Sequence, residues 1–173
     1  MSYLINFLLF QVAWFAGILG ASHQMASLGV TVILLCLGIH FWRLPKQQIR
    51  AEALLVARCL ALGFVIDSSL IQTQLMSYAS AGLIEGISPL WMCLLWATLA
   101  ITLNHSLAWL KRSYWLAAIL GSITGPLSYL AGVKLGAGSM PNQAITLIAL
   151  GLIWAIAMPL MVKWSRVAIE KMD

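Results

Sequence analysis

Apolar residues gather in six runs along the chain, and each run is close to the length that a helix needs to cross a bilayer. About 20 apolar residues in helical conformation span the hydrocarbon core of a membrane. Short segments that hold most of the charged residues separate the runs. This pattern predicts an all-α, polytopic membrane bundle that forms a single domain over residues 1–173. The predicted spans are about 3–20, 26–42, 55–75, 88–109, 114–133 and 141–162.

The composition supports lipid as the solvent of this chain. Hydrophobic residues make up 62% of the sequence, and charged residues make up only 9%, against about 25% in a soluble domain. A soluble chain of 173 residues has too small an interior to bury so much apolar surface. The composition therefore excludes a soluble enzyme, a secreted disulfide scaffold and a disordered protein.

The basic residues predict the orientation of the chain. The net charge is +5, but the cations lie between apolar runs, so we interpret them as topology signals and expect no nucleic-acid partner. In a six-span arrangement only Lys134 lies on one side of the membrane. The positive-inside rule then places both termini in the cytoplasm. The cations on the other side are Arg43, Lys46, Arg50, Arg58, Lys111, Arg112, Lys163, Arg166 and Lys171.

Two segments allow more than one interpretation. The first run resembles a signal peptide, but it has no basic residue before it and is long for such a segment, so we expect a retained helix. Residues 44–57 are basic and polar. They suit either a cytoplasmic loop that fixes topology, which we favour, or a short helix at the membrane surface.

Polar residues at membrane depth mark the candidate site. Asp67 lies near the middle of the third run, where an ionised side chain costs about 2.5–3.5 kcal/mol on insertion scales. Gln11 lies at a similar depth in the first run, and Tyr129 lies one turn beyond the middle of the fifth. Lys134 is about 15 Å from the centre of its run, so we expect no ion pair between Lys134 and Asp67. A role of Asp67 in an interhelical hydrogen bond alone is the alternative.

The fifth run combines small residues with a proline. Gly121, Gly125, Ser128 and Gly132 form a stripe on one face, which is typical of close helix packing in membranes. Pro126 should bend the helix, because it cannot donate a backbone hydrogen bond. Bent helices expose backbone groups to substrates in many transporters, but they also occur in bundles that bind nothing.

The eight tryptophans divide into two groups by depth. Trp42, Trp91, Trp109, Trp115 and Trp164 lie at the ends of spans, where an aromatic belt is expected. The other three lie near mid-span, where an indole N–H requires a partner. Rings at this depth suit a ligand pocket, and they also suit ordinary core packing. These three are Trp14, Trp96 and Trp154.

The sequence contains no pattern typical of catalysis or of metal binding. His23, His40 and His105 are far apart, and no acidic residue accompanies them at ligand spacing. The three cysteines also lack such spacing. We therefore expect no catalytic residues, no metal and no cofactor.

Several local motifs resemble those of a family of small proteobacterial inner-membrane proteins that is catalogued as a domain of unknown function. The most specific is Gly-Pro-Leu-Ser-Tyr at 125–129, followed by Lys-Leu-Gly-Ala at 134–137. Further similar positions are Asn6, Phe10 and Trp14. The resemblance covers essentially the whole chain and implies a multi-pass protein of the bacterial inner membrane. It implies no activity. The association of this family with genes for lipid modification favours a lipid-like ligand.

These features predict a binding or transport module for a small apolar or lipid-like ligand in a pocket near the midplane. The expected partners are membrane lipids, this ligand and a partner subunit that docks on small-residue stripes such as Ala13, Gly17 and Ala21. The alternative functions are a lipid-modifying enzyme that uses Asp67 and an accessory subunit of a membrane complex. The candidate binding residues are Asp67, Gln11, Trp14, Trp96, Gly125, Pro126, Tyr129 and Trp154.

Overall fold

The apolar runs form helices, because a backbone in lipid must satisfy its hydrogen bonds within its own segment. The computed structural model describes residues 2–80, 82 and 84–170. Among them are one 3₁₀-helix, η1 (Ala108–Arg112), and two short strands, β1 (Ser77–Tyr78) and β2 (Gly138–Ser139). The α-helices are α1 (Tyr3–Ser22), α2 (Ala26–Trp42), α3 (Lys46–Gln72), α4 (Leu90–Ala100), α5 (Tyr114–Lys134) and α6 (Gln143–Glu170).

Four of the described helices, α1, α3, α5 and α6, are long and apolar enough to cross a membrane. Their outward surfaces are apolar as well. On α6, for example, Ile148, Leu152 and Ile156 are all more than half exposed. Such continuous apolar surfaces are typical of helices that face lipid. The prediction of an all-α bundle is confirmed.

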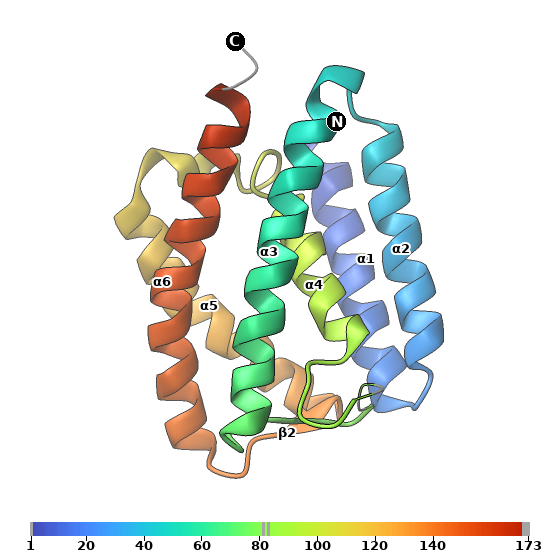
Figure 1. Ribbon diagram of the computed structural model, residues 1–173, viewed down its shortest axis with the longest axis vertical. Helices are drawn as coiled ribbons and strands as arrows, with labels where there is room; N and C mark the ends of the chain where they lie inside the picture. Colours follow the sequence, from blue (N-terminus) through green and yellow to red (C-terminus); the bar gives the residue numbers. More distant parts are fainter. Residues whose placement is uncertain (1, 81, 83, 171–173) are drawn as a thin grey trace.

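Helix α4 lies in the middle of the bundle (Figure 1). It packs against α1, α2 and α3, while α5 and α6 pack on each other and α6 also contacts α3. Nearly all of its side chains are buried, among them Trp91, Trp96 and Ala100. Because no continuous face of α4 is exposed, it is a core helix enclosed by the longer helices.

The predicted fourth span, 88–109, is wrong as a single long helix. Helix α4 has 11 residues, which corresponds to about 16 Å, roughly half of the hydrocarbon thickness. The chain continues as turns that are fixed by the buried Asn6 of α1. The Asn6 amide donates to the Ile101 carbonyl (3.0 Å) and accepts from the Ser106 hydroxyl (2.7 Å). Irregular backbone is tolerated at membrane depth where protein groups satisfy it in this way.

Of residues 44–57, all from Lys46 onward form the first turns of α3, so the favoured interpretation of this segment as a loop is wrong. Helix α3 begins at Lys46 and continues into the apolar run. Glu52 and Leu55 are buried against the bundle, whereas Lys46 and Arg50 are exposed. The segment is helical because its buried positions recur at helical spacing. It is continuous with the apolar part of α3 and is not a separate helix.

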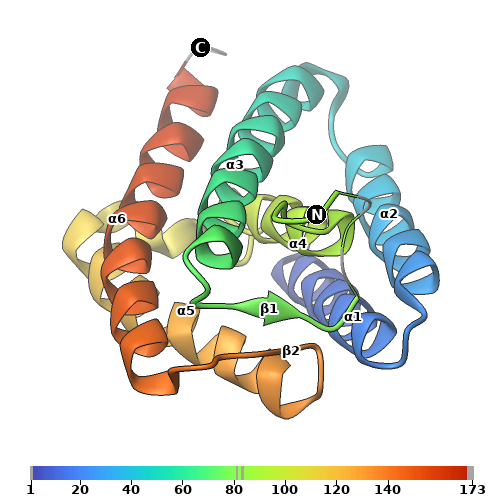
Figure 2. The same cartoon turned by 60° about the horizontal axis from the view of Figure 1, so that its bottom comes forward.

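The two ends of the bundle differ in charge. Helix α1 begins and α6 ends at one end, here named the terminal end, and β1 and β2 cross the opposite end, named the strand end (Figures 1 and 2). The cations at the α2–α3 turn, in η1 and late in α6 lie towards the terminal end, whereas Lys134 ends α5 at the strand end. Lys171 lies outside the described residues. The side of the membrane that each end faces stays a prediction.

Candidate ligand-binding site

Asp67 is fully buried in α3 and accepts three hydrogen bonds. The hydroxyls of Tyr78 and Tyr129 each donate to its Oδ1 atom at 2.7 Å. The indole nitrogen of Trp96 donates to its Oδ2 atom, also at 2.7 Å. Hydrogen bonds to an ionised carboxylate are short and strong in a low dielectric. This carboxyl group therefore connects β1, α4 and α5 to α3.

The two strands bring Tyr78 to Asp67. Strand β1 pairs with β2 in antiparallel register, with Tyr78 opposite Gly138. A side chain at Gly138 would overlap the Ser77 carbonyl, so this approach requires glycine. Burial, together with the nearby Asp67 carboxylate, raises the pKa of the Tyr78 phenol above its usual range. The phenol therefore stays protonated and donates to Asp67.

Two stacked indole rings lie beside this carboxyl group. The centroids of Trp96 and Trp154 are 4.6 Å apart, and their planes differ by 11°. Gly63 of α3 makes room for the Trp96 ring, and Gly125 of α5 makes room for the Trp154 ring, because a Cβ atom at either glycine would overlap the indole. The glycines thus allow α3 and α5 to approach the central pair.

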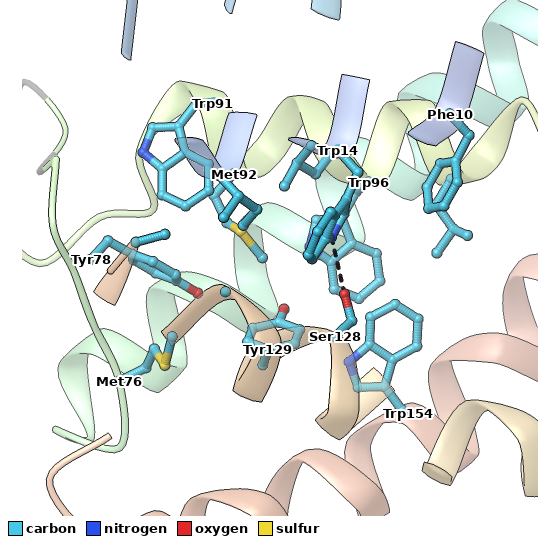
Figure 3. A pocket seen from close by; sticks show the side chains of 15 residues that line it. Phe10, Trp14, Met76, Tyr78, Trp91, Met92, Trp96, Ser128, Tyr129 and Trp154 are labelled. Atoms are coloured by element: carbon cyan, nitrogen blue, oxygen red, sulfur yellow. Dashed lines mark hydrogen bonds between the residues drawn. The ribbon is translucent and has the colours of Figure 1, made fainter. Parts of the chain in front are cut away.

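The stack forms one wall of a pocket with a volume of about 70 Å³. Helices α1, α4, α5 and α6 and the segments around β1 and β2 contribute its other walls, and Figure 3 shows the aromatic rings gathered around it. The walls are mostly apolar and aromatic, which is typical of sites for small organic ligands. The lining residues are Phe10, Trp14, Ile18, Met76, Tyr78, Trp91, Met92, Leu95, Trp96, Leu99, Ser128, Tyr129, Gly132, Ala137 and Trp154.

The pocket walls contain a few polar groups, and one of them has no partner. The Trp14 indole donates to the Ser128 hydroxyl at 3.1 Å, across the gap between α1 and α5. The Trp154 indole nitrogen is buried and finds no hydrogen-bond acceptor among the described residues. An unpaired buried donor costs about 1–3 kcal/mol. An acceptor atom supplied by a ligand would remove this cost.

The structure brings together most of the predicted site residues. Trp96 and Tyr129 bind Asp67, Trp154 stacks on Trp96, and Gly125 contacts Trp154. Lys134 is exposed at the strand end, and it forms no ion pair with Asp67 in the described part of the chain. The expectation for this pair is confirmed.

The remaining predicted residues have other positions. Trp14 lines the pocket but does not contact Asp67 by a hydrogen bond. Gln11 is half-buried and is neither a donor to Asp67 nor a lining residue of the pocket, so its part in ligand binding stays a prediction. Pro126 is buried inside α5, which stays helical through it. The bend at Pro126 stays a prediction.

Sequence reasoning missed two aromatic residues of the site. Tyr78 lies in a segment between the predicted spans, where no hydrophobic periodicity in the sequence indicates that its hydroxyl contacts Asp67. Trp91 was expected in the lipid-facing belt, but it is buried: its indole donates to the Ser80 carbonyl at 3.2 Å, and its ring meets Tyr78 edge to face. Trp42 and Trp115, by contrast, are highly exposed, as a belt requires.

The chain belongs to a family described as "Protein of unknown function (DUF2878)", whose model matches residues 3–160. This finding confirms the resemblance to an uncharacterised family. No curated protein and no solved structure matches the chain. Family membership therefore brings no activity with it, and the functional argument depends on the pocket.

Proposed function

We propose that this protein binds one end of a small lipid-like molecule in the aromatic pocket, as a membrane binding or transport module. The observation that carries the proposal is the unpaired Trp154 indole N–H in a pocket whose walls are mostly apolar and aromatic. Apolar walls favour hydrocarbon, and one free donor favours an oxygen acceptor beside it. An acyl ester, a fatty acid or a fatty alcohol combines these two features.

The size of the pocket limits what it holds. Its volume of about 70 Å³ provides space for about five water-sized groups. Whole drug-sized ligands occupy about 300–1,000 Å³. The pocket therefore suits a short segment of the ligand near an oxygen atom, while the rest of the molecule remains outside it in the bilayer.

Binding fits the geometry better than lipid modification does. Both oxygens of Asp67 accept hydrogen bonds from protein side chains. The carboxyl group is fully buried behind these donors, and Asp67 is not among the residues that line the pocket. Asp67 thus fixes the two tyrosines and Trp96, and these side chains form the pocket wall.

The small-residue stripe of α1 gives no support to the accessory-subunit alternative. Ala13, Gly17 and Ala21 are all buried within the chain. A Cβ atom at Gly17 would lie 3.1 Å from a methyl group of Leu95 in α4 and 3.2 Å from one of Ile33 in α2. This stripe is used for packing inside the bundle, so it is not free to bind another subunit.

The proposal includes a location in the bacterial cytoplasmic membrane with both termini in the cytoplasm. Its support is the concentration of cations towards the terminal end. The positive-inside rule associates such an excess with the cytoplasmic side.

Photolabelling tests the proposed function. The purified protein is irradiated with a long-chain fatty acid, or a phospholipid built from it, that carries a diazirine. We expect labelled peptides around Met76 and Met92. Leu99→Phe, which extends a ring into the pocket, should reduce this labelling about tenfold, which corresponds to about 1.4 kcal/mol.

The matched control is Leu90→Phe, because Leu90 lies on the same helix but is exposed and does not line the pocket. The peptides around Met76 and Met92 should be labelled to the same extent in this variant as in the original protein. Equal labelling of these peptides in Leu90→Phe and Leu99→Phe would refute binding in the pocket.

A further inference from the structure

A second polar cluster lies towards the terminal end of the bundle, on elements other than those that place Asp67. His40 is in the last turn of α2, Glu52 is in the second turn of α3, and His105 is in the turns after α4. One potential ligand atom from each of these side chains lies within 4.8 Å of the other two. Three separate segments thus converge on one point.

Four buried polar atoms of this cluster make no hydrogen bond among the described residues. They are both ring nitrogens of His40, the Oε1 atom of Glu52 and the Nε2 atom of His105. His40 is fully buried, and Glu52 is 4% exposed. Buried polar atoms are nearly always paired in native proteins, so unpaired atoms that point to one place indicate a missing common partner.

The spacing of the cluster suits a metal ion. The His40 Nε2 and Glu52 Oε1 atoms are 3.2 Å apart, which is within ion-pair distance, but their geometry is not that of a hydrogen bond. Two ligands of a tetrahedral ion, each about 2.1 Å from it, lie about 3.4 Å apart. The rings of His40 and His105 have centroids 5.1 Å apart, and a ring nitrogen of His105 lies within 4.8 Å of the ligand atoms of the other two residues.

A second layer of contacts orients the glutamate. Asn104 donates to the Oε2 atom of Glu52 at 2.6 Å and accepts a hydrogen bond from the Lys111 ammonium. This leaves Oε1 directed to the histidines, as outer contacts do for the ligands of metal sites.

We propose that His40, Glu52 and His105 bind one divalent first-row transition metal ion, with zinc as the expected ion. Two imidazoles and one carboxylate form a ligand set that zinc adopts in proteins, with a fourth position for water. The ion ties α2, α3 and the turns after α4 together where the core helix ends. The proposal does not rest on ligand binding in the aromatic pocket, because that pocket has other lining residues.

The spacing of histidines along the chain predicted no metal site. His40 and His105 are 65 positions apart, and the three residues lie on three different segments: α2, α3 and the turns after α4. Only the packing of α2 and α3 around α4 brings the three together. The proposed site therefore departs from the expectation of no metal, which was based on spacing along the chain alone.

Metal content tests the proposal. The purified full chain is treated with a chelator to remove bound metal, incubated with Zn²⁺ and separated from unbound Zn²⁺. Its metal content is then measured by elemental mass spectrometry. We expect about one ion per chain. The His40→Ala and His105→Ala variants should each retain much less zinc than the unsubstituted protein. The control is His23→Ala, because His23 is exposed between α1 and α2 and should not affect the content.

Absorption spectroscopy at the zinc edge on the unsubstituted protein provides a measurement that needs no variant to fold. The proposal requires nitrogen and oxygen ligands with the scattering pattern of two imidazoles. Sulfur ligands would contradict it and would point to the buried cysteines instead. Failure of the unsubstituted chain to retain zinc, cobalt, manganese or iron would overturn it, as would undiminished metal in folded His40→Ala protein.

Discussion

Trp96 of α4 and Trp154 of α6 stack face to face, with ring centroids 4.6 Å apart. The outer face of each ring lies against a glycine, Gly63 for Trp96 and Gly125 for Trp154. Four helices therefore meet at this one pair of side chains. Trp96 also donates to Asp67, so the stack connects the packing of the bundle to the buried carboxyl group.

Alanine at either of these glycines should destabilise the fold. The added Cβ atom of Gly63→Ala or Gly125→Ala would overlap an indole ring that is held on its other face. Overpacking of this kind costs about 1–3 kcal/mol. Thermal unfolding of the detergent-solubilised protein measures the loss.

The control for these variants is Gly38→Ala in α2, where a Cβ atom would meet no other atom within 4 Å. Alanine there should be neutral or should stabilise by up to about 1 kcal/mol, because it favours the helix. Gly63→Ala protein as stable as the Gly38→Ala protein would show that the stack does not restrain the helices.

Asp67→Asn should destabilise the protein although it preserves the shape of the side chain. The carboxylate accepts three donors through two oxygens, whereas an amide offers one oxygen and one NH₂ group. At least one of Tyr78, Tyr129 and Trp96 then faces another donor, at a cost of about 1–3 kcal/mol.

Two comparisons make this prediction specific. Tyr129→Phe removes one donor and leaves the carboxylate with the other two, so its effect should be smaller, about 1 kcal/mol. Ser69→Ala, at an exposed position of the same helix, should have little effect. Equal unfolding temperatures for Asp67→Asn, Ser69→Ala and the original protein would contradict the role of Asp67.

Accessibility labelling tests the orientation. Single cysteines at Ser80, near the strand end, and at Gln47, near the terminal end, are introduced after replacement of the three native cysteines. A membrane-impermeant maleimide applied to intact cells should label Ser80→Cys and not Gln47→Cys. Permeabilised cells provide the control, because Gln47→Cys should then react. External labelling of both positions would be incompatible with the predicted topology.

Hydropathy and helical periodicity were enough to predict the long helices and a buried Asp67 near Tyr129, but they did not indicate the hydrogen bond from Trp96. Hydropathy could not show that α4 is short, because a helix enclosed by protein and one enclosed by lipid are equally apolar. The position of Tyr78 depends on strand pairing between residues about 60 positions apart. The cluster of His40, Glu52 and His105 depends on three packed segments. Contacts of this kind leave no local pattern in the sequence.

Ligand binding in the aromatic pocket is the central claim, and a density map of the protein extracted with its native lipids tests it most directly. We predict elongated density that enters the pocket between α1 and α5, with a polar atom within hydrogen-bond distance of the Trp154 indole nitrogen. A map in which side chains close the pocket, or in which the Trp154 nitrogen donates to a protein acceptor and lipid density occurs only on the outer surface, would contradict the claim.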